Sequence, residues 1–194
     1  MASQMGKVLV IGISGTTNSG KSTLTRNLLD KLPNAVSVCQ DTYFLPPGDD
    51  RLAPLYIQEL DHHNWEDYRA LEMENMVADV FNLFNHSGMA NKGDCIVIIE
   101  GYTIFGWQPL AKLCDLKYFL PIDRELCWQR RRFRNYNPPD KPGYFDKVVW
   151  PMHLKHLELI KDDPNIVYLE DSCLENRVSR ILEDINKCLC SHQQ

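Results

Sequence analysis

The segment 15–22 has the residue types and the spacing of a phosphate-binding loop. Its sequence, GTTNSGKS, fits the pattern G-x-x-x-x-G-K-[ST] and lies between an apolar run and a helix-like stretch. Backbone N–H groups of such a loop point at phosphate oxygens, and the helix N-terminus adds partial positive charge. Lys21 would reach the β- and γ-phosphates, and the Ser22 hydroxyl would bind Mg²⁺. The motif predicts that phosphate groups bind to Gly15, Thr16, Thr17, Asn18, Ser19, Gly20, Lys21, Ser22 and Thr23.

Two carboxylates, Asp41 and Glu100, stand near the ends of apolar runs that we predict to be strands. Ligands of a parallel sheet bind beyond the carboxyl ends of the strands, so both acids should face the γ-phosphate. Phosphoryl transfer to a hydroxyl needs a carboxylate that takes the proton, and Mg²⁺ needs oxygen ligands. Both acids are candidates for catalysis beside Lys21 and for metal binding beside Ser22, and which one is the principal base stays open. The structural alternative is a capping or turn role.

Four arginines stand close together at Arg130, Arg131, Arg132 and Arg134. With roughly 100° between successive helical residues, the first and last share a face while the other two point elsewhere. A single solvated stripe would not scatter its charges in this way. A lid that closes over a triphosphate uses several directions at once, and its arginines would stabilise the transferring phosphoryl group. We therefore predict an arginine-rich lid over about residues 124–143, with a solvated basic helix as the alternative.

The segment after the arginines is a candidate binding loop for a flat ring. Its prolines predict a stiff, shaped loop. Tyr136 in this loop could stack on the ring, and Trp65 could form the opposite wall. Glu66 and Asp67 could accept hydrogen bonds from sugar hydroxyls. For the two aromatic residues alone, burial in the core is an equally good interpretation.

Apolar runs alternate with helical patterns along the chain, which predicts an α/β fold with a parallel sheet covered on both faces. Helices are expected over 73–84, with Phe81 in the apolar stripe, and over 174–189, where apolar residues recur at helical spacing. Another helix should begin near Asp123, with Leu126 as one apolar anchor. The predicted strands are 7–14, 35–39, 95–99, 116–120 and 166–169, and the two longest loops are 45–65 and 135–144.

The composition is that of a globular protein of 194 residues with a net charge of −5, which argues against nucleic acid as a partner. Seven cysteines, an odd number without a C-x-x-C pair, favour a reducing compartment. A zinc site at Cys188, Cys190 and His192 is disfavoured because no second ligand pair is near. The N-terminus lacks the pattern of a signal peptide, and its apolar run is too short to cross a membrane. We expect a single cytoplasmic domain over residues 1–194, with no membrane partner.

Over nearly its whole length the chain resembles the nicotinamide riboside kinases, within the uridine-kinase-like group of P-loop kinases. The shared segments are GISG at 12–15, NSGKS at 18–22, QD at 40–41, YF at 43–44, IIEG at 98–101 and RRR at 130–132. The most specific block is YNPPD at 136–140, PGYFD at 142–146 and VWP at 149–151, which uridine–cytidine kinases do not share. The resemblance implies a P-loop kinase fold with a parallel five-stranded sheet, flanking helices and an arginine-rich lid.

The resemblance also implies a reaction. ATP, with Mg²⁺, would give its γ-phosphoryl group to the ribose 5′-hydroxyl of nicotinamide riboside, and of nicotinic acid riboside, for NAD biosynthesis. Asp41 would be the base, and Trp65 and Tyr136 would sandwich the nicotinamide ring. The lid residues serving ATP would be Arg130, Arg132 and Arg134. The acceptor site would comprise Asp41, Thr42, Tyr43, Phe44, Trp65, Glu66, Arg131, Tyr136, Asn137 and Asp140, and the metal site Ser22, Asp41 and Glu100.

Two positions depart from the family's pattern. Thr42 replaces a second acid that often follows the first, and Glu66 stands where the ribose-binding acid is usually aspartate, which leaves Asp67 as its rival. Another small acceptor, such as uridine or cytidine, is the alternative within the same fold. Outside it, the alternatives are a regulatory nucleotide-binding module and a partner-binding protein with a vestigial loop. The lid and the intact Lys21 and Ser22 favour the kinase.

Overall fold

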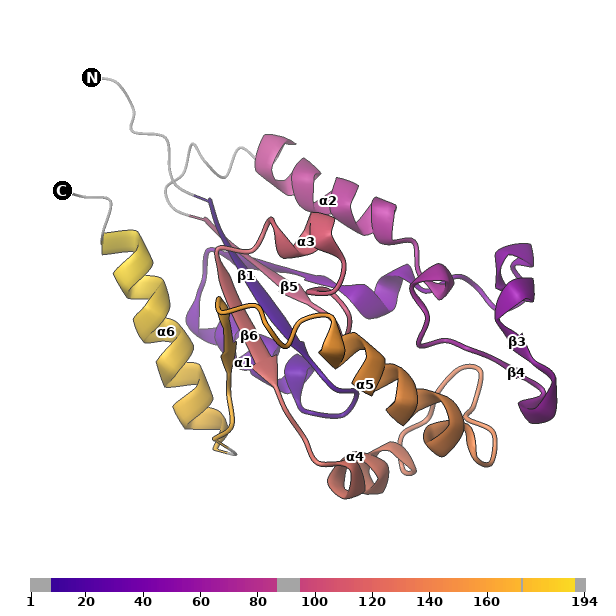
Figure 1. The fold of residues 1–194 in the computed structure, drawn as a ribbon. Helices are drawn as coiled ribbons and strands as arrows, with labels where there is room; N and C mark the ends of the chain where they lie inside the picture. The colour runs from indigo at the N-terminus through magenta and orange to yellow at the C-terminus, as the bar shows by residue number, and fades with distance from the viewer. Residues whose placement is uncertain (1–7, 87–94, 172, 191–194) are drawn as a thin grey trace.

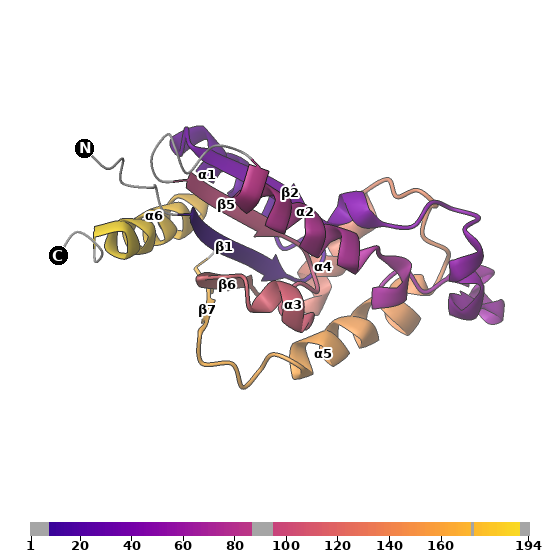
Figure 2. The same cartoon turned by 90° about the horizontal axis from the view of Figure 1, so that it is seen from above.

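A parallel sheet forms the centre of the molecule, in a computed structural model that describes residues 8–86, 95–171 and 173–190. Its strand order is β2-β5-β1-β6-β7, and every neighbouring pair is parallel (Figures 1 and 2). All six residues of β5 are buried, as expected for an apolar strand with neighbours on both sides. The five predicted strands are confirmed as β1 (Val8–Gly15), β2 (Ala35–Cys39), β5 (Cys95–Glu100), β6 (Leu116–Leu120) and β7 (Ile166–Tyr168).

Helices cover both faces of the sheet. Alternate residues of β1 point to opposite faces, so Leu9, Ile11 and Ile13 pack with helices α1 (Lys21–Lys31) and α6 (Leu174–Cys190). Val10 faces the other way and packs with the second core cluster. That cluster takes its helical residues from α2 (Met73–His86) and α3 (Gln108–Ala111), with Ile160 just beyond α5 (Trp150–Glu158). The predicted α/β architecture is therefore confirmed.

The segment predicted as a long loop over 45–65 is more ordered than expected. It contains a 3₁₀ helix, Asp50–Leu55, and a small antiparallel hairpin of β3 (Tyr56–Ile57) and β4 (His62–His63). Strands of two residues are too short to show a periodic pattern, so they could not be predicted from hydrophobic periodicity. Figures 1 and 2 place this hairpin, α4 (Arg124–Arg131) and α5 beyond the carboxyl ends of the strands.

Two apolar residues that were predicted to be buried are exposed, namely the anchor Leu126 and the stripe residue Phe81. The helix α4 begins as expected, because the Asp123 side chain accepts a hydrogen bond from Leu126 N at 2.8 Å. The Leu126 side chain, however, is 37% exposed, and Cys127 is the fully buried residue of this helix. In α2, Phe81 is 46% exposed although its spacing fits the buried stripe. On both helices, the face that is buried against the rest of the protein is narrower than the apolar pattern predicted.

Among the described helices, none is both long enough and apolar enough to cross a membrane. The seven cysteines, all of them among the described residues, form no disulfide. The described residues contain no group of three or more His, Cys, Asp or Glu side chains arranged to hold a metal ion. His192, the third member of the disfavoured zinc set, lies outside the described residues.

Candidate active site

A cavity of about 810 Å³ lies where the carboxyl ends of the strands meet the arginine-bearing segment. Cavities at this edge of a parallel sheet are the usual ligand sites of α/β proteins. Its lining combines residues from the predicted phosphate loop, from the ends of β2 and β5, and from the lid. The site residues that it brings together are Thr17, Asn18, Ser19, Gly20, Lys21, Ser22, Thr23, Asp41, Phe44, Trp65, Glu66, Glu100, Arg130, Arg131, Arg134, Tyr136, Asn137 and Asp140.

The phosphate loop connects β1 to α1 and needs glycine at two positions. Gly15 has a φ of 145°, and a Cβ there would lie 2.5 Å from the Leu120 carbonyl oxygen. Gly20, with a φ of 100°, is the N-cap residue of α1. Side chains other than hydrogen are strained in this left-handed region. The two glycines thus let the chain turn tightly and start a helix at the cavity, as the motif predicted.

Lys21 is held inside the phosphate loop. Its Nζ donates to the carbonyl oxygens of Gly15 at 3.0 Å and Thr16 at 2.9 Å. Burial lowers the pKa of Lys21, while the nearby carboxylates of Asp41 and Glu100 act in the opposite direction. The ammonium group therefore lies ready beside the place where phosphate charge would arrive, and it has only weak carbonyl partners to exchange for that charge.

The two candidate acids have different surroundings. Glu100 is buried, and its carboxylate accepts a hydrogen bond from the Ser22 hydroxyl. The Asp41 side chain is 54% exposed in the cavity, with Arg134 as its ion-pair partner at 3.9 Å. A hydroxyl and a carboxylate side by side form an oxygen-donor set that fits Mg²⁺, which is commonly held by one or two carboxylates together with substrate phosphates. The geometry therefore favours Glu100 for the metal side and leaves Asp41 open to an acceptor.

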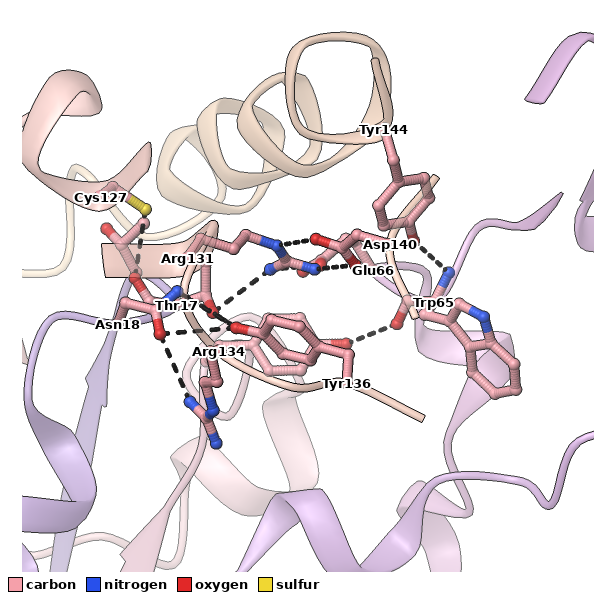
Figure 3. A network of polar contacts seen from close by, with 12 residues as sticks. Thr17, Asn18, Trp65, Glu66, Cys127, Arg131, Arg134, Tyr136, Asp140 and Tyr144 are labelled. Atoms are coloured by element: carbon pink, nitrogen blue, oxygen red, sulfur yellow. Dashed lines mark hydrogen bonds and ion pairs between the residues drawn. The ribbon is translucent and has the colours of Figure 1, made fainter. Parts of the chain in front are cut away.

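A buried ion-pair network joins the lid to the acceptor end of the cavity (Figure 3). Arg131 is only 4% exposed and pairs with Glu66 at 3.3 Å and Asp140 at 2.6 Å. Its Nη1 also donates to Thr17 Oγ1 at 3.3 Å, and its guanidinium lies 4.4 Å from the centroid of the Tyr136 ring. One arginine thus touches the phosphate loop, two acids and an aromatic wall.

Burial governs the charge of Glu66. It raises the pKa of this carboxyl group, although the guanidinium of Arg131 opposes the shift. For Arg131, burial acts to lower the pKa, but Glu66 and Asp140 outweigh it, so the net shift is upward. Asp67 does not line the cavity, because its side chain caps a 3₁₀ turn and pairs with Arg69 at 2.9 Å. Of the two rival acids, the geometry therefore favours Glu66 for contact with a sugar.

Removing the Arg131 guanidinium is expected to destabilise the fold. In Arg131→Met, Glu66 becomes a buried carboxylate without its cation, which costs about 3 kcal/mol or more. A carboxyl group with a raised folded-state pKa favours folding at low pH and loses that contribution as the pH rises through that pKa. The loss in melting temperature relative to the parent chain should therefore be larger at about pH 7.5 than at about pH 5.

The exposed neighbour Arg132 supplies the control for this prediction, since Arg132→Met should change stability by less than about 0.5 kcal/mol. Thermal unfolding of the parent and both variants at the two pH values is the measurement. Equal stability of the parent and Arg131→Met at neutral pH would contradict a structural role for the network.

The lid rests on the phosphate loop through two more arginines. Arg130 Nη1 donates to the Asn18 carbonyl oxygen at 3.0 Å, and Arg134 Nη1 donates to Asn18 Oδ1 at 3.5 Å. Helix α4 ends at Arg131, yet Arg130 and Arg134 still reach the same side, as predicted. Arg132 does not line the cavity, because its guanidinium lies over the exposed Phe133 ring, 4.6 Å from the centroid. The structure therefore places three of the four arginines at the site.

The two predicted aromatic walls come from distant segments. Tyr136 is tied to the phosphate loop by a hydrogen bond of 3.1 Å from Asn18 Nδ2 to its hydroxyl. Trp65 is anchored through its backbone: its N–H donates to the Tyr144 hydroxyl at 2.9 Å, and its carbonyl accepts from the Tyr102 hydroxyl at 3.0 Å. Both residues line the cavity, so neither is a core residue alone.

Besides Arg132, four predicted site residues are not among those that line the cavity. Gly15 and Thr16 form the base of the phosphate loop, and the Thr16 hydroxyl contacts His153 Nε2 at 3.2 Å. Thr42 donates to the Cys39 carbonyl oxygen at 2.8 Å. Tyr43 points to α2, where its hydroxyl donates to Asp79 at 2.8 Å. The side chains of Thr42 and Tyr43 are therefore engaged in hydrogen bonds within the fold and do not point into the cavity.

Several residues at or beside the site went unrecognised in the sequence. Tyr102 lies two residues after Glu100, and its position at a strand end could have found it. Tyr144 lines the cavity from the most specific block of the chain, although no role at the site was assigned to it, and Arg177 lines it from a segment with no local signal. His153 lies behind the phosphate loop, where burial lowers its pKa to about 4 and keeps the ring neutral at physiological pH. Such long-range neighbours become visible only once the fold brings their helices to the site.

The phosphate loop, the arginine lid and the two acids at the edge of a parallel sheet define a P-loop kinase. Solved structures with this fold include a sugar kinase from Janibacter (TM-score 0.58, 14% identity, covering 94% of this chain and 97% of that chain). A second is thymidylate kinase from Candida albicans (TM-score 0.50, 18% identity, covering 94% and 92%). No family model matches the chain.

Curated relatives narrow the class further. Nicotinamide riboside kinase 1 from Rattus norvegicus is 37% identical over 191 residues, which cover 93% of this chain and 95% of the relative. Nicotinamide riboside kinase 2 from Homo sapiens is 34% identical, over 96% of this chain and 84% of the relative. The chain therefore belongs to the nicotinamide riboside kinase family. A uridine kinase from Leuconostoc citreum is a more distant relative, at 25% identity over 84% of this chain and 88% of the relative.

Proposed function

We propose that this protein transfers the γ-phosphoryl group of ATP to the ribose 5′-hydroxyl of nicotinamide riboside, giving the mononucleotide used in NAD biosynthesis. Nicotinic acid riboside, with the same ribose, is proposed as a second acceptor. One observation carries the proposal: a single cavity holds the phosphate loop at one end and the aromatic and acidic residues Trp65, Glu66 and Tyr136 at the other. The names of the relatives, nicotinamide riboside kinases 1 and 2, agree with it.

The proposed roles follow from the surroundings of each group. Asp41 takes the proton of the 5′-hydroxyl, since its carboxylate is open to the cavity. Lys21 compensates the charge of the transferring group, and Arg130 and Arg134 hold the triphosphate from the lid side. Glu66 and Asp140, fixed by Arg131, are placed to accept hydrogen bonds from the sugar hydroxyls.

Mg²⁺ would be held by the Ser22 hydroxyl and the Glu100 carboxylate, together with the phosphates, and Asp41 is the further candidate ligand. When bound, the ion neutralises phosphate charge that develops during transfer. The short Ser22–Glu100 hydrogen bond already brings the two oxygen donors together.

Release of ADP that depends on the acceptor is the test of this function. With ATP and Mg²⁺, the protein should release ADP quickly when nicotinamide riboside is present and slowly when it is absent. Release of ADP at the same rate without an acceptor would indicate an NTPase instead. No release under either condition would indicate a nucleotide-binding module or a vestigial loop.

Uridine or cytidine is the second candidate acceptor, because uridine kinases are among the more distant relatives. Nicotinamide riboside carries a flat cationic ring, which two aromatic walls attract by stacking and by cation–π contact. Trp65 and Tyr136, with the carboxylates of Asp41, Glu66 and Asp140 on the same cavity, suit a cation better than a neutral pyrimidine. A neutral pyrimidine would keep the stacking contact but lose the cation–π attraction.

Removing either aromatic wall should weaken acceptor binding selectively. A cation–π contact is worth about 0.5–2 kcal/mol, so Trp65→Ala and Tyr136→Ala should each raise KM for nicotinamide riboside by about 2- to 30-fold. KM for ATP should change less. Tyr136→Phe is the matched control, because it keeps the ring and removes only the hydroxyl that meets Asn18. Unchanged acceptor KM in both alanine variants would exclude the aromatic sandwich.

A further inference from the structure

Gln40 is a buried amide between the carboxyl ends of β2 and β5. Its side chain has no exposed surface. The Gln40 oxygen accepts hydrogen bonds from the backbone N–H groups of Tyr102 at 2.9 Å and Thr103 at 3.2 Å. Its nitrogen donates to Thr103 Oγ1 at 2.8 Å and to Met73 Sδ at 3.3 Å. Both acceptor positions and both donor positions of the amide are therefore used.

These bonds tie together the two segments that carry the acids of the site. Gln40 immediately precedes Asp41, while the N–H groups that it binds follow Glu100 by two and three residues. The backbone register already pairs Cys39 with Glu100 in the neighbouring strands. The backbone pairing of β2 with β5 ends at these two residues. Beyond them, the side-chain amide of Gln40 connects the two segments. The amide thereby joins the segment that carries Asp41 to the segment that follows Glu100.

The turn after Glu100 is shaped around this amide. A Cβ added to Gly101 would lie 2.5 Å from the Gln40 side-chain oxygen and 2.6 Å from its Cβ. Only glycine lets the backbone approach so closely. The connection also extends to the acceptor end, since the Tyr102 hydroxyl donates to the Trp65 carbonyl oxygen at 3.0 Å.

We propose that Gln40 is a positioning residue, which holds the Asp41 carboxylate in register with the Ser22–Glu100 pair and fixes the segment that supports Trp65. The inference rests on the proposed function, because it requires Asp41 to receive the proton of the acceptor. Phosphoryl transfer depends on in-line placement, and a displacement of about 1 Å can cost about 100-fold in rate. Gln40 touches none of the groups that react, so it acts through Asp41 and Tyr102.

Three variants test the role in graded steps. Gln40→Met keeps the length of the side chain and removes the donors and acceptors, and we expect kcat to fall by about 10- to 100-fold. The Mg²⁺ concentration for half-maximal activity should rise, while KM for ATP stays within about twofold. Thr103→Val removes only the hydroxyl partner and should give a smaller change in the same direction. Met73→Leu removes only the sulfur contact of a core residue and should keep the parent kinetics.

Kinetics per folded molecule and melting temperature are measured together. Lower melting temperature with unchanged kcat and Mg²⁺ requirement in Gln40→Met would overturn the positioning role and leave a purely structural one. If Gln40→Met does not fold, the same measurements are made on Thr103→Val and are judged by the same criteria. A parent chain inactive toward nicotinamide riboside would instead contradict the proposed function, so the two failures are distinguishable.

Discussion

Lys21→Ala is expected to lower kcat by at least about 100-fold while the fold stays intact. A positive charge placed in advance beside developing negative charge is worth several kcal/mol in a site shielded from water. The Lys21 ammonium group is buried, and the phosphate-loop carbonyl oxygens hold it beside the place where the phosphates would bind. The measurement is steady-state turnover with saturating ATP and nicotinamide riboside, together with a thermal unfolding curve.

Lys31 offers the matched control, because it lies on the same helix, at the exposed end far from the loop. Lys31→Ala removes an equal charge and should leave kcat within about twofold. Near-normal turnover in Lys21→Ala would contradict the assignment of the loop to the transferring phosphates.

Asp41→Asn is expected to lower kcat by about 10²- to 10⁴-fold, with KM for ATP little changed. The amide keeps the shape of the carboxylate and cannot take a proton. Asp41 suits the role because its carboxylate is open to the cavity, whereas Glu100 is engaged with Ser22. Glu100→Gln should act differently, chiefly by raising the Mg²⁺ concentration needed for activity.

The control for the base is Asp67→Asn, which alters an acid close to the acceptor segment but outside the cavity lining. It should leave kcat and acceptor KM near the parent values. A variant pair in which Glu100→Gln loses turnover and Asp41→Asn keeps it would reverse the assignment of the base. Loss of acceptor binding in Asp67→Asn would reverse the choice of Glu66 over Asp67.

Residues whose role depends on their own side chain and on their spacing from close neighbours in the chain could be predicted from the sequence. The phosphate loop is of this kind, because Gly15, Gly20 and Lys21 need only a strand before them and a helix after them. The parallel strands are likewise encoded in continuous apolar runs, such as β5. The arginine lid was predictable from the different directions that neighbouring helical residues must take, and Arg132 alone turns away from the cavity.

Features that depend on tertiary packing could not be predicted. The exposure of Leu126 is set by which side of α4 meets the phosphate loop, where Cys127 donates to the Thr17 carbonyl oxygen at 3.3 Å. The role of Gln40 depends on Thr103, which is 63 residues away in the chain. The single-domain organisation and the cytoplasmic location stay predictions.

A direct comparison of acceptors tests the central claim that this kinase acts on nicotinamide riboside. The measurement is kcat/KM of the parent protein for nicotinamide riboside, uridine and cytidine, at saturating ATP and Mg²⁺. The expected result is the highest kcat/KM for nicotinamide riboside, without complete exclusion of the two pyrimidines. A higher kcat/KM for uridine or cytidine would contradict it and assign the cavity to a pyrimidine nucleoside instead.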